Sequence, residues 1–167
     1  MIAEMDDAVK ALLYRVEAQR LMLGLSREAL STEAGYGRSY WSDTMNGRSK
    51  CRCVDQFQRC AEVVGMNLCV NGRPASVNQI LLAIDDERER LDWKRYEVAR
   101  IVGIRPCTYS SYMSGAFRPS LIGLVRLAAA VGLRITCEPN IKITERIYDT
   151  EQSGAGAASF RPMEPRR

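Results

Sequence analysis

The chain repeats itself at an offset of about 68 residues, and this repeat limits the folds that are open to it. Aligning Gly35 with Gly103 brings apolar residues onto apolar residues, as with Val16 on Ile84. After deletion of one residue near position 118 the pattern continues, with the pairs Val54/Leu121, Phe57/Leu124, Ala61/Ala128 and Gly65/Gly132. Two copies of one small helical unit therefore explain the 167 residues better than a single irregular domain does.

Each unit is expected to hold four helices, because its apolar residues recur at helical intervals and its glycines interrupt them. Ser26 is expected to cap the second helix, Ser76 begins the fifth, and Pro106 suits a first helical turn. The predicted helices of the first unit span 6–22, 27–34, 38–45 and 54–64. Those of the second unit span 77–91, 94–102, 106–113 and 121–131.

A short extended segment follows the last helix of each unit. The segments "MNLCV" at 66–70 and "LRITC" at 133–137 alternate as half-buried strands do, so we expect them to pair. The fold class predicted is mainly all-α, with a small two-stranded sheet joining the units. The expected domains are 1–70 and 76–138, joined by a linker at 71–75, with a C-terminal extension at 139–167 that is disordered from about 150. Segment 142–148 is open between strand and helix.

Composition argues against an enzyme and against a metal or other cofactor. The chain has no histidine, the commonest general base and metal ligand. The cysteines of "CRC" at 51–53 are too close together for a zinc knuckle, and there is no glycine motif that cradles phosphate. No apolar run is long enough to cross a membrane, and the first residues lack a signal peptide, so a cytoplasmic protein with reduced thiols is expected. The net charge of +4 permits a nucleic-acid partner without requiring one.

The segment "LSREALSTEAGYGRSYWSDTMNGRSK" resembles the lambda-repressor/Cro-like (XRE-family) helix-turn-helix module. In it Ser31 is the small residue of the scaffold helix, Gly35 makes the turn, and Asn46 begins the closing run. The segment "WKRYEVARIVGIRPCTYSSYMSGAFRPS" is similar to the same module, with Ala99 and Gly103 in those places. The resemblance implies two such domains in tandem that bind double-stranded DNA through recognition helices near 38–46 and 106–113, in adjacent major grooves.

The residues of the first recognition helix divide by face. Trp41 and Thr44 are expected to point inward, and Arg38 can donate two hydrogen bonds to guanine. Ser39 and Tyr40 can donate to base edges or phosphate. The outward set expected to contact DNA is Arg38, Ser39, Tyr40 and Asp43, followed by Asn46, Arg48, Lys50 and Arg52.

Two members of that set need comment. Asn46 is expected to bind phosphate, as the resemblance implies. Phosphates repel the carboxylate of Asp43, so we expect it to pair within the chain, with Arg38 or Arg48, unless it accepts from a cytosine.

The second unit presents a plainer face with only two basic residues. Tyr109 takes the place of Trp41 and is expected in the core. The DNA-contacting residues expected here are Arg105, Thr108, Ser111, Ser114 and Arg118.

Two classes of function stay open. The first is a sequence-specific DNA-binding transcriptional regulator, associated with the nucleoid through DNA, whose two units mimic a dimer within one chain. The alternative is a protein-interaction module of the antitoxin or anti-activator type, which keeps the fold and binds a partner protein. RNA polymerase or another regulatory protein is a further partner considered, and a homodimer is not excluded.

Overall fold

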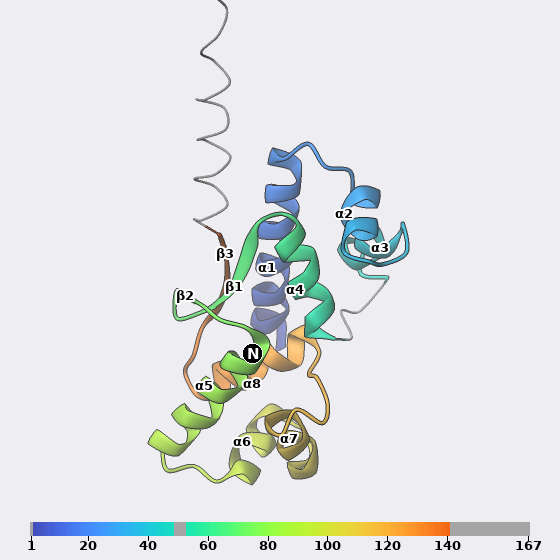
Figure 1. Ribbon diagram of the computed structural model, residues 1–167. Helices are drawn as coiled ribbons and strands as arrows, with labels where there is room; N and C mark the ends of the chain where they lie inside the picture. The colour runs from blue at the N-terminus through green and yellow to red at the C-terminus, as the bar shows by residue number, and fades with distance from the viewer. Residues whose placement is uncertain (1, 49–52, 141–167) are drawn as a thin grey trace, which may run out of the picture.

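The computed structural model describes residues 2–48 and 53–140 (Figure 1). The fold is mainly helical with one small antiparallel sheet. The helices are α1 (Ile2–Met22), α2 (Arg27–Glu33), α3 (Tyr40–Met45), α4 (Val54–Val63), α5 (Val77–Arg90), α6 (Arg95–Val102), α7 (Pro106–Met113) and α8 (Leu121–Ala130). The strands are β1 (Met66–Val70), β2 (Arg73–Pro74) and β3 (Ile135–Pro139). Lys50, Arg52 and the predictions for 142–148 and for the tail lie outside the described residues.

The eight predicted helices are present, and most of their boundaries agree. Ser26 and Ser76 each accept a hydrogen bond from a backbone N–H three residues on, as N-terminal caps do. Three predicted starts differ by two residues or more. Helix α1 begins at Ile2, four residues before the predicted start at residue 6. Helix α3 begins at Tyr40 and not at residue 38, because a turn closed by the Tyr40 N–H on the Gly37 carbonyl precedes it. Strand β3 begins two residues late, because the Leu133 N–H still bonds back to the α8 carbonyl of Ala128.

The sheet has three strands in the order β2-β1-β3, one more than expected. The predicted pairing of the two terminal segments is confirmed: β1 and β3 run antiparallel, with Leu68 opposite Cys137. The extra strand β2 lies in the segment expected to be a plain linker. Asn71 and Gly72 both have positive φ there, which is the geometry of a two-residue hairpin turn.

The two halves of the chain are related by an approximate two-fold axis. Strands β1 and β3 follow equivalent helices, and equivalent strands that pair antiparallel exchange places on rotation by a half-turn. Cys69 lies opposite Thr136, its counterpart at the offset of 67 that applies after the one-residue deletion, so the axis passes through this pair.

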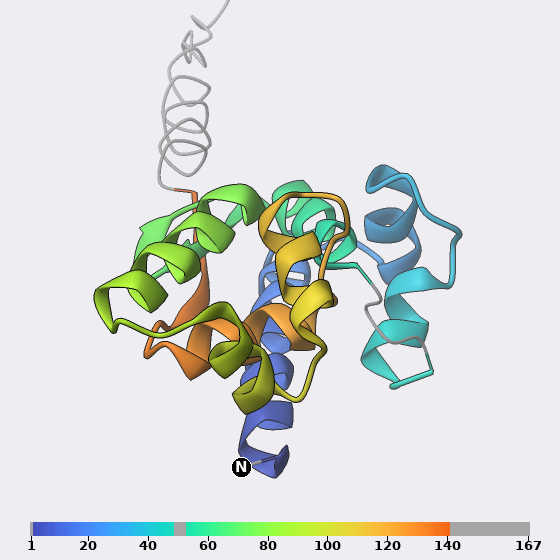
Figure 2. The same ribbon diagram turned by 90° about the horizontal axis from the view of Figure 1, so that it is seen from below.

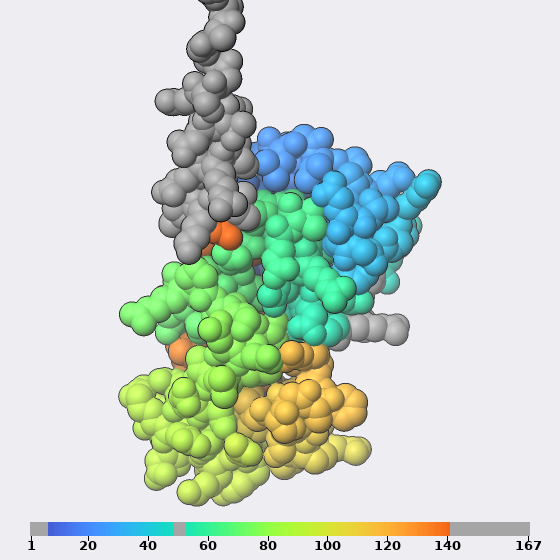
Figure 3. Space-filling model, in the orientation of Figure 1, coloured from blue at the N-terminus to red at the C-terminus, as the bar shows by residue number. Residues whose placement is uncertain are grey.

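One continuous core holds the halves together. Buried apolar side chains from both halves form a single cluster that includes Val16, Phe57, Ile80 and Leu124. Helix α1 packs along α8, and α4 and α8 meet near the sheet (Figures 1 and 2). The α2–α3 pair lies at one end of the molecule and the α6–α7 pair at the other (Figure 3). The fold therefore carries two similar helix pairs on a shared support.

Candidate functional site

Hydrogen bonds on the buried face of α3 hold it against α2. The hydroxyl of the fully buried Ser31 accepts a hydrogen bond from the Trp41 backbone N–H at 3.0 Å and donates to the Arg27 carbonyl at 2.8 Å. The side chains of Trp41 and Thr44 are buried, as predicted. Gly35 takes φ +83° between the helices, a conformation that side chains other than glycine's rarely allow. The inner face of α3 is thus fixed, and its other face is left for solvent.

A buried carboxylate anchors the same helix to α1. Glu17 accepts hydrogen bonds from Arg20 at 2.9 and 2.8 Å, from Arg27 Nε at 2.8 Å and from Trp41 Nε1 at 2.7 Å. The hydrogen bonds from Arg20 lower the pKa of Glu17 to about 2, and those from Trp41 and Arg27 add to the effect against the opposing cost of burial. Glu17 is therefore ionised at neutral pH and holds three segments in one network.

The second half repeats this anchor. Asp85 accepts hydrogen bonds from Arg88 Nε at 2.6 Å, from Arg95 at 2.9 Å and from the Tyr109 hydroxyl at 3.1 Å. Burial raises the pKa of Asp85, but the two arginines outweigh it and the net shift is downward. Tyr109 is fully buried, as predicted. Each of these four residues lies 68 positions after its counterpart in the Glu17 network, so α7 is held as α3 is.

The apolar pattern of the sequence does not indicate these networks. The signal was present, because arginines occur at positions 20 and 88 and again at 27 and 95, at the offset of the repeat. Attention to the apolar pattern alone passed over it.

The outer face of α3 is polar and carries exposed cations. The Arg38 side chain is 82% exposed, and its Nε lies 3.3 Å from the Glu28 carboxylate of α2. Ser39, Asn46 and Arg48 are also exposed, as expected.

The expected ion pair of Asp43 with Arg38 or Arg48 is not present among the described residues. Arg38 pairs with Glu28 instead, and Arg48 meets Asp43 only through its backbone N–H, which donates to the Asp43 carbonyl at 2.8 Å. Within residues 2–48 and 53–140 the Asp43 carboxylate forms no ion pair.

The prediction that the Tyr40 side chain points outward is wrong. Its ring packs on Tyr36, with ring centroids 4.6 Å apart, and its hydroxyl is 3.4 Å from Gln56 Oε1. The Tyr40 side chain is thus turned toward α4, which carries Gln56. Burial raises the pKa of Tyr36, and the nearby Arg59 opposes that rise. Arg59 is an exposed cation of α4 beside this face, and the sequence analysis did not identify it.

The outer face of α7 offers fewer groups to a partner. Arg105 and Ser114 are exposed, whereas Thr108 and Ser111 are half-buried. The Ser111 hydroxyl donates to the Cys107 carbonyl at 2.9 Å, and that of Ser114 donates to the Ser111 carbonyl at 3.2 Å. The hydroxyls of Ser111 and Ser114 therefore already donate to the backbone of their own helix.

Arg118 joins the halves of the molecule. Its Nε lies 3.4 Å from the Asp55 carboxylate of α4, and its guanidinium also donates to Asn78 of α5. Next to it, the Val54 N–H donates to the Pro119 carbonyl at 3.0 Å. The loop before α8 is thereby tied to the start of α4. Arg118 was expected to contact DNA, but its guanidinium instead binds Asp55 and Asn78 between the two halves.

Among the described side chains, no group of three or more His, Cys, Asp or Glu residues is placed to hold a metal ion. No helix in the described ranges has the length and apolar character needed to span a bilayer. Protein-family models, curated proteins and solved structures were all compared with the chain, and none of them matches it.

Proposed function

We propose that the chain is a sequence-specific regulator that binds double-stranded DNA through two helix-turn-helix units of the lambda-repressor type. In this proposal α2–α3 and α6–α7 are the two units, and α3 and α7 enter the major groove. The observation that carries the proposal is the repeated anchor. Glu17 and Asp85 hold equivalent helices by equivalent hydrogen bonds and leave a polar outer face on each.

The chemistry of the α3 face supports a polyanionic partner. Arg38, Arg48 and Arg59 are exposed cations on or beside this face, and Ser39 and Asn46 add neutral groups that hydrogen-bond to base edges or phosphate. A rigid support matters here, because ordering a flexible reading segment would reduce the affinity gained from its contacts. The anchored inner face of α3 avoids that cost.

The approximate two-fold axis supports a particular arrangement of target. Two reading helices related by a half-turn approach two half-sites that are themselves related by a half-turn, which means an inverted repeat. The outer faces of α3 and α7 differ in sequence, so the two half-sites differ as well. We therefore expect an imperfect inverted repeat.

The proposal is tested by selection from a pool of random duplexes at two salt concentrations. The wild-type chain is expected to enrich one motif, and Arg38→Ala is expected to lose discrimination at one base pair, about 1–3 kcal/mol. The matched control is Arg73→Ala, which removes an exposed arginine from β2, away from both faces. Failure of the wild type to enrich any motif at either salt concentration contradicts the proposal.

A protein-interaction module is the second candidate, and one feature of the α7 end favours it. The hydroxyls of Ser111 and Ser114 donate to backbone carbonyls of α7, while the neighbouring Phe117 is 68% exposed. An exposed aromatic beside a weakly charged helix is better suited to a protein partner than to phosphate. Under this alternative the pool yields no motif, and Phe117→Ala releases a partner such as RNA polymerase or another regulatory protein.

A further inference from the structure

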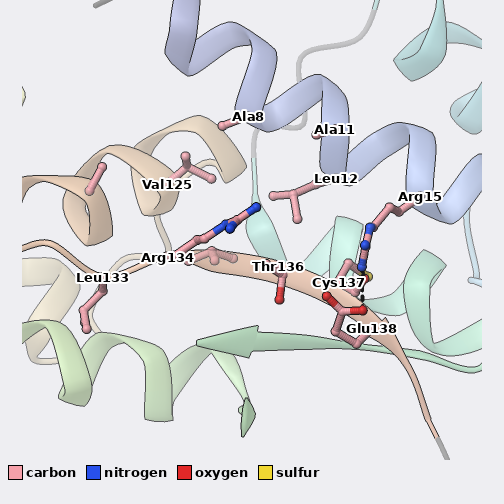
Figure 4. A pocket seen from close by; sticks show the side chains of 12 residues that line it. Ala8, Ala11, Leu12, Arg15, Val125, Leu133, Arg134, Thr136, Cys137 and Glu138 are labelled. Atoms are coloured by element: carbon pink, nitrogen blue, oxygen red, sulfur yellow. Dashed lines mark hydrogen bonds and ion pairs between the residues drawn. The ribbon is translucent and has the colours of Figure 1, made fainter. Parts of the chain in front are cut away.

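A groove between α1, α8 and β3 lies apart from the outer faces of α3 and α7 (Figure 4). Its volume is about 480 Å³, within the roughly 300–1,000 Å³ usual for small-molecule sites. Its helical walls are Ala8 and Ala11 of α1 and Val125 and Ala129 of α8. Short apolar side chains therefore keep the groove open.

The two-fold relation gives this groove a counterpart between α5, α4 and β1, with a volume of about 220 Å³. Ser76 and Gln79 of α5 stand in the second groove where Ala8 and Ala11 stand in the first. The two walls are thus equivalent in the repeat but opposite in polarity.

The walls formed by the fourth helix of each half differ in the same way. Gln58 and Glu62 of α4 take the places of Val125 and Ala129 of α8. Their side chains bond to each other, with Gln58 Nε2 donating to Glu62 Oε1 at 2.7 Å. Longer polar side chains that bond among themselves thus occupy this wall of the second groove.

The chain itself fills the rest of the second groove. Ser76 and Gln79 bond to each other in a capping box, and Pro74 and Ala75 of the β2 hairpin line the space. The first groove has no such hairpin among its lining residues. The described residues of the chain therefore fill much of the second groove, whereas the equivalent residues leave the first groove open and apolar.

The first groove also carries a positive charge that has no partner among the described side chains. Arg134, the residue immediately before β3, stands where the second groove has Asn67, and its guanidinium reaches toward α1 beside Leu12 (Figure 4). The side chain is exposed and makes no ion pair or side-chain hydrogen bond with the described residues. Arg15, in contrast, lies 2.5 Å from Glu138 and donates to the Cys137 carbonyl at 2.9 Å.

We propose that this groove binds a small amphipathic anion, a carboxylate on an apolar body. The carboxylate pairs with the Arg134 guanidinium, whose two parallel N–H groups match its two oxygens. The apolar body lies against Leu12, Ala8 and Val125. Arg15 and Glu138 neutralise each other at the end of the groove, so among the described lining residues Arg134 supplies the net charge. This inference does not depend on DNA binding by α3 and α7.

Titration of the full chain with the fluorescent amphipathic anion 8-anilinonaphthalene-1-sulfonate tests the site. We expect saturable binding of one molecule per chain. Arg134→Gln is expected to weaken binding about tenfold through loss of the charged partner. Ala129→Leu is expected to weaken it as strongly by filling the groove, and Ala129 is exposed enough to accept the larger side chain without disturbing the core. The controls Arg100→Gln and Ala18→Leu change exposed residues of α6 and α1 that do not line the groove.

Competition separates the anionic from the apolar part of the proposal. Octanoate is expected to displace the probe from the wild type at least tenfold better than 1-octanol does, and Arg134→Gln is expected to remove that preference. Unsaturable probe binding, or binding that both groove variants leave unchanged, overturns the site. Equal competition by octanoate and octanol overturns its selectivity for anions.

Discussion

Trp41 Nε1 donates a hydrogen bond of 2.7 Å to the buried carboxylate of Glu17, and this bond fastens α3 to α1. The Tyr109 hydroxyl donates to Asp85 in the same place of the second half, at 3.1 Å. A side chain from the buried face of α3 therefore binds it to α1, and a side chain from the buried face of α7 binds it to α5. This arrangement makes the orientation of both helices depend on the ionised state of one carboxylate each.

Removal of the charge at Glu17 is expected to destabilise the chain at neutral pH and much less in acid. The folded pKa of about 2 lies below the ordinary value of 4.5, so the stabilisation is complete above pH 4.5 and is lost as the pH falls toward 2. The shift corresponds to about 3 kcal/mol. Urea unfolding of Glu17→Gln at pH 7 and at pH 2.5 measures the difference from wild type.

Glu33→Gln serves as the matched control for that experiment, because Glu33 is an exposed carboxylate of α2. Its stability is expected to stay within about 0.5 kcal/mol of wild type at both pH values. A Glu17→Gln variant as stable as wild type at pH 7 contradicts the anchoring role of Glu17.

Much of this fold could be predicted from the sequence, because local signals and the repeat agree. Ser76 and Pro106 correctly predict the starts of α5 and α7, and the apolar repeat predicts the pairing of β1 with β3. The Asn71-Gly72 dipeptide is also typical of a hairpin turn, although the prediction for 71–75 is a linker between units.

The rest depends on packing at a distance. Nothing near position 40 indicates that the Tyr40 ring turns onto Tyr36, because the last turn before α3 decides it. Arg118 was assigned to the outer surface from its place after α7, but its partners Asp55 and Asn78 come from remote parts of the chain. Short helices and single loop residues leave too few periodic positions for sequence to fix which way a side chain points.

Glu28→Gln is expected to tighten binding to the enriched duplex about two- to fivefold. Arg38 must leave Glu28 to reach a base, and an exposed ion pair of this kind contributes less than about 1 kcal/mol. The variant also removes a negative charge that repels phosphate. Fluorescence anisotropy with the selected duplex measures the change, and Glu33→Gln on the same helix should give a smaller effect. Equal effects of the two substitutions would place Arg38 outside the contact.

Arg118→Ala is expected to lower stability without weakening DNA binding. It removes a half-exposed ion pair with Asp55 and a hydrogen bond to Asn78, worth about 1 kcal/mol together. Asp55→Asn should reproduce most of that loss in urea unfolding. Duplex affinity of Arg118→Ala should remain within about twofold of wild type. A tenfold loss of affinity at unchanged stability would return Arg118 to the DNA contact.

The orientation of the half-sites follows from the pairing of Cys69 with Thr136 across the approximate two-fold axis. Two synthetic duplexes with the same half-sites and spacing, one inverted and one direct, make the comparison. The inverted arrangement is expected to bind at least tenfold tighter, because only it lets both helices reach their half-sites. If the direct repeat binds as well or better, the half-sites are not related as the protein halves are.

The presentation of two reading helices by one chain is tested most directly by a hydroxyl-radical footprint on the selected duplex. We expect two protected tracts on one face of the DNA, about 10 base pairs apart. Arg38→Ala should weaken one tract and leave the other, because Arg38 lies in the turn that precedes α3 and the α6–α7 pair does not include it. Absence of protection at protein concentrations that saturate binding in the anisotropy assay would contradict DNA reading by α3 and α7, and a single tract would contradict it for one of them.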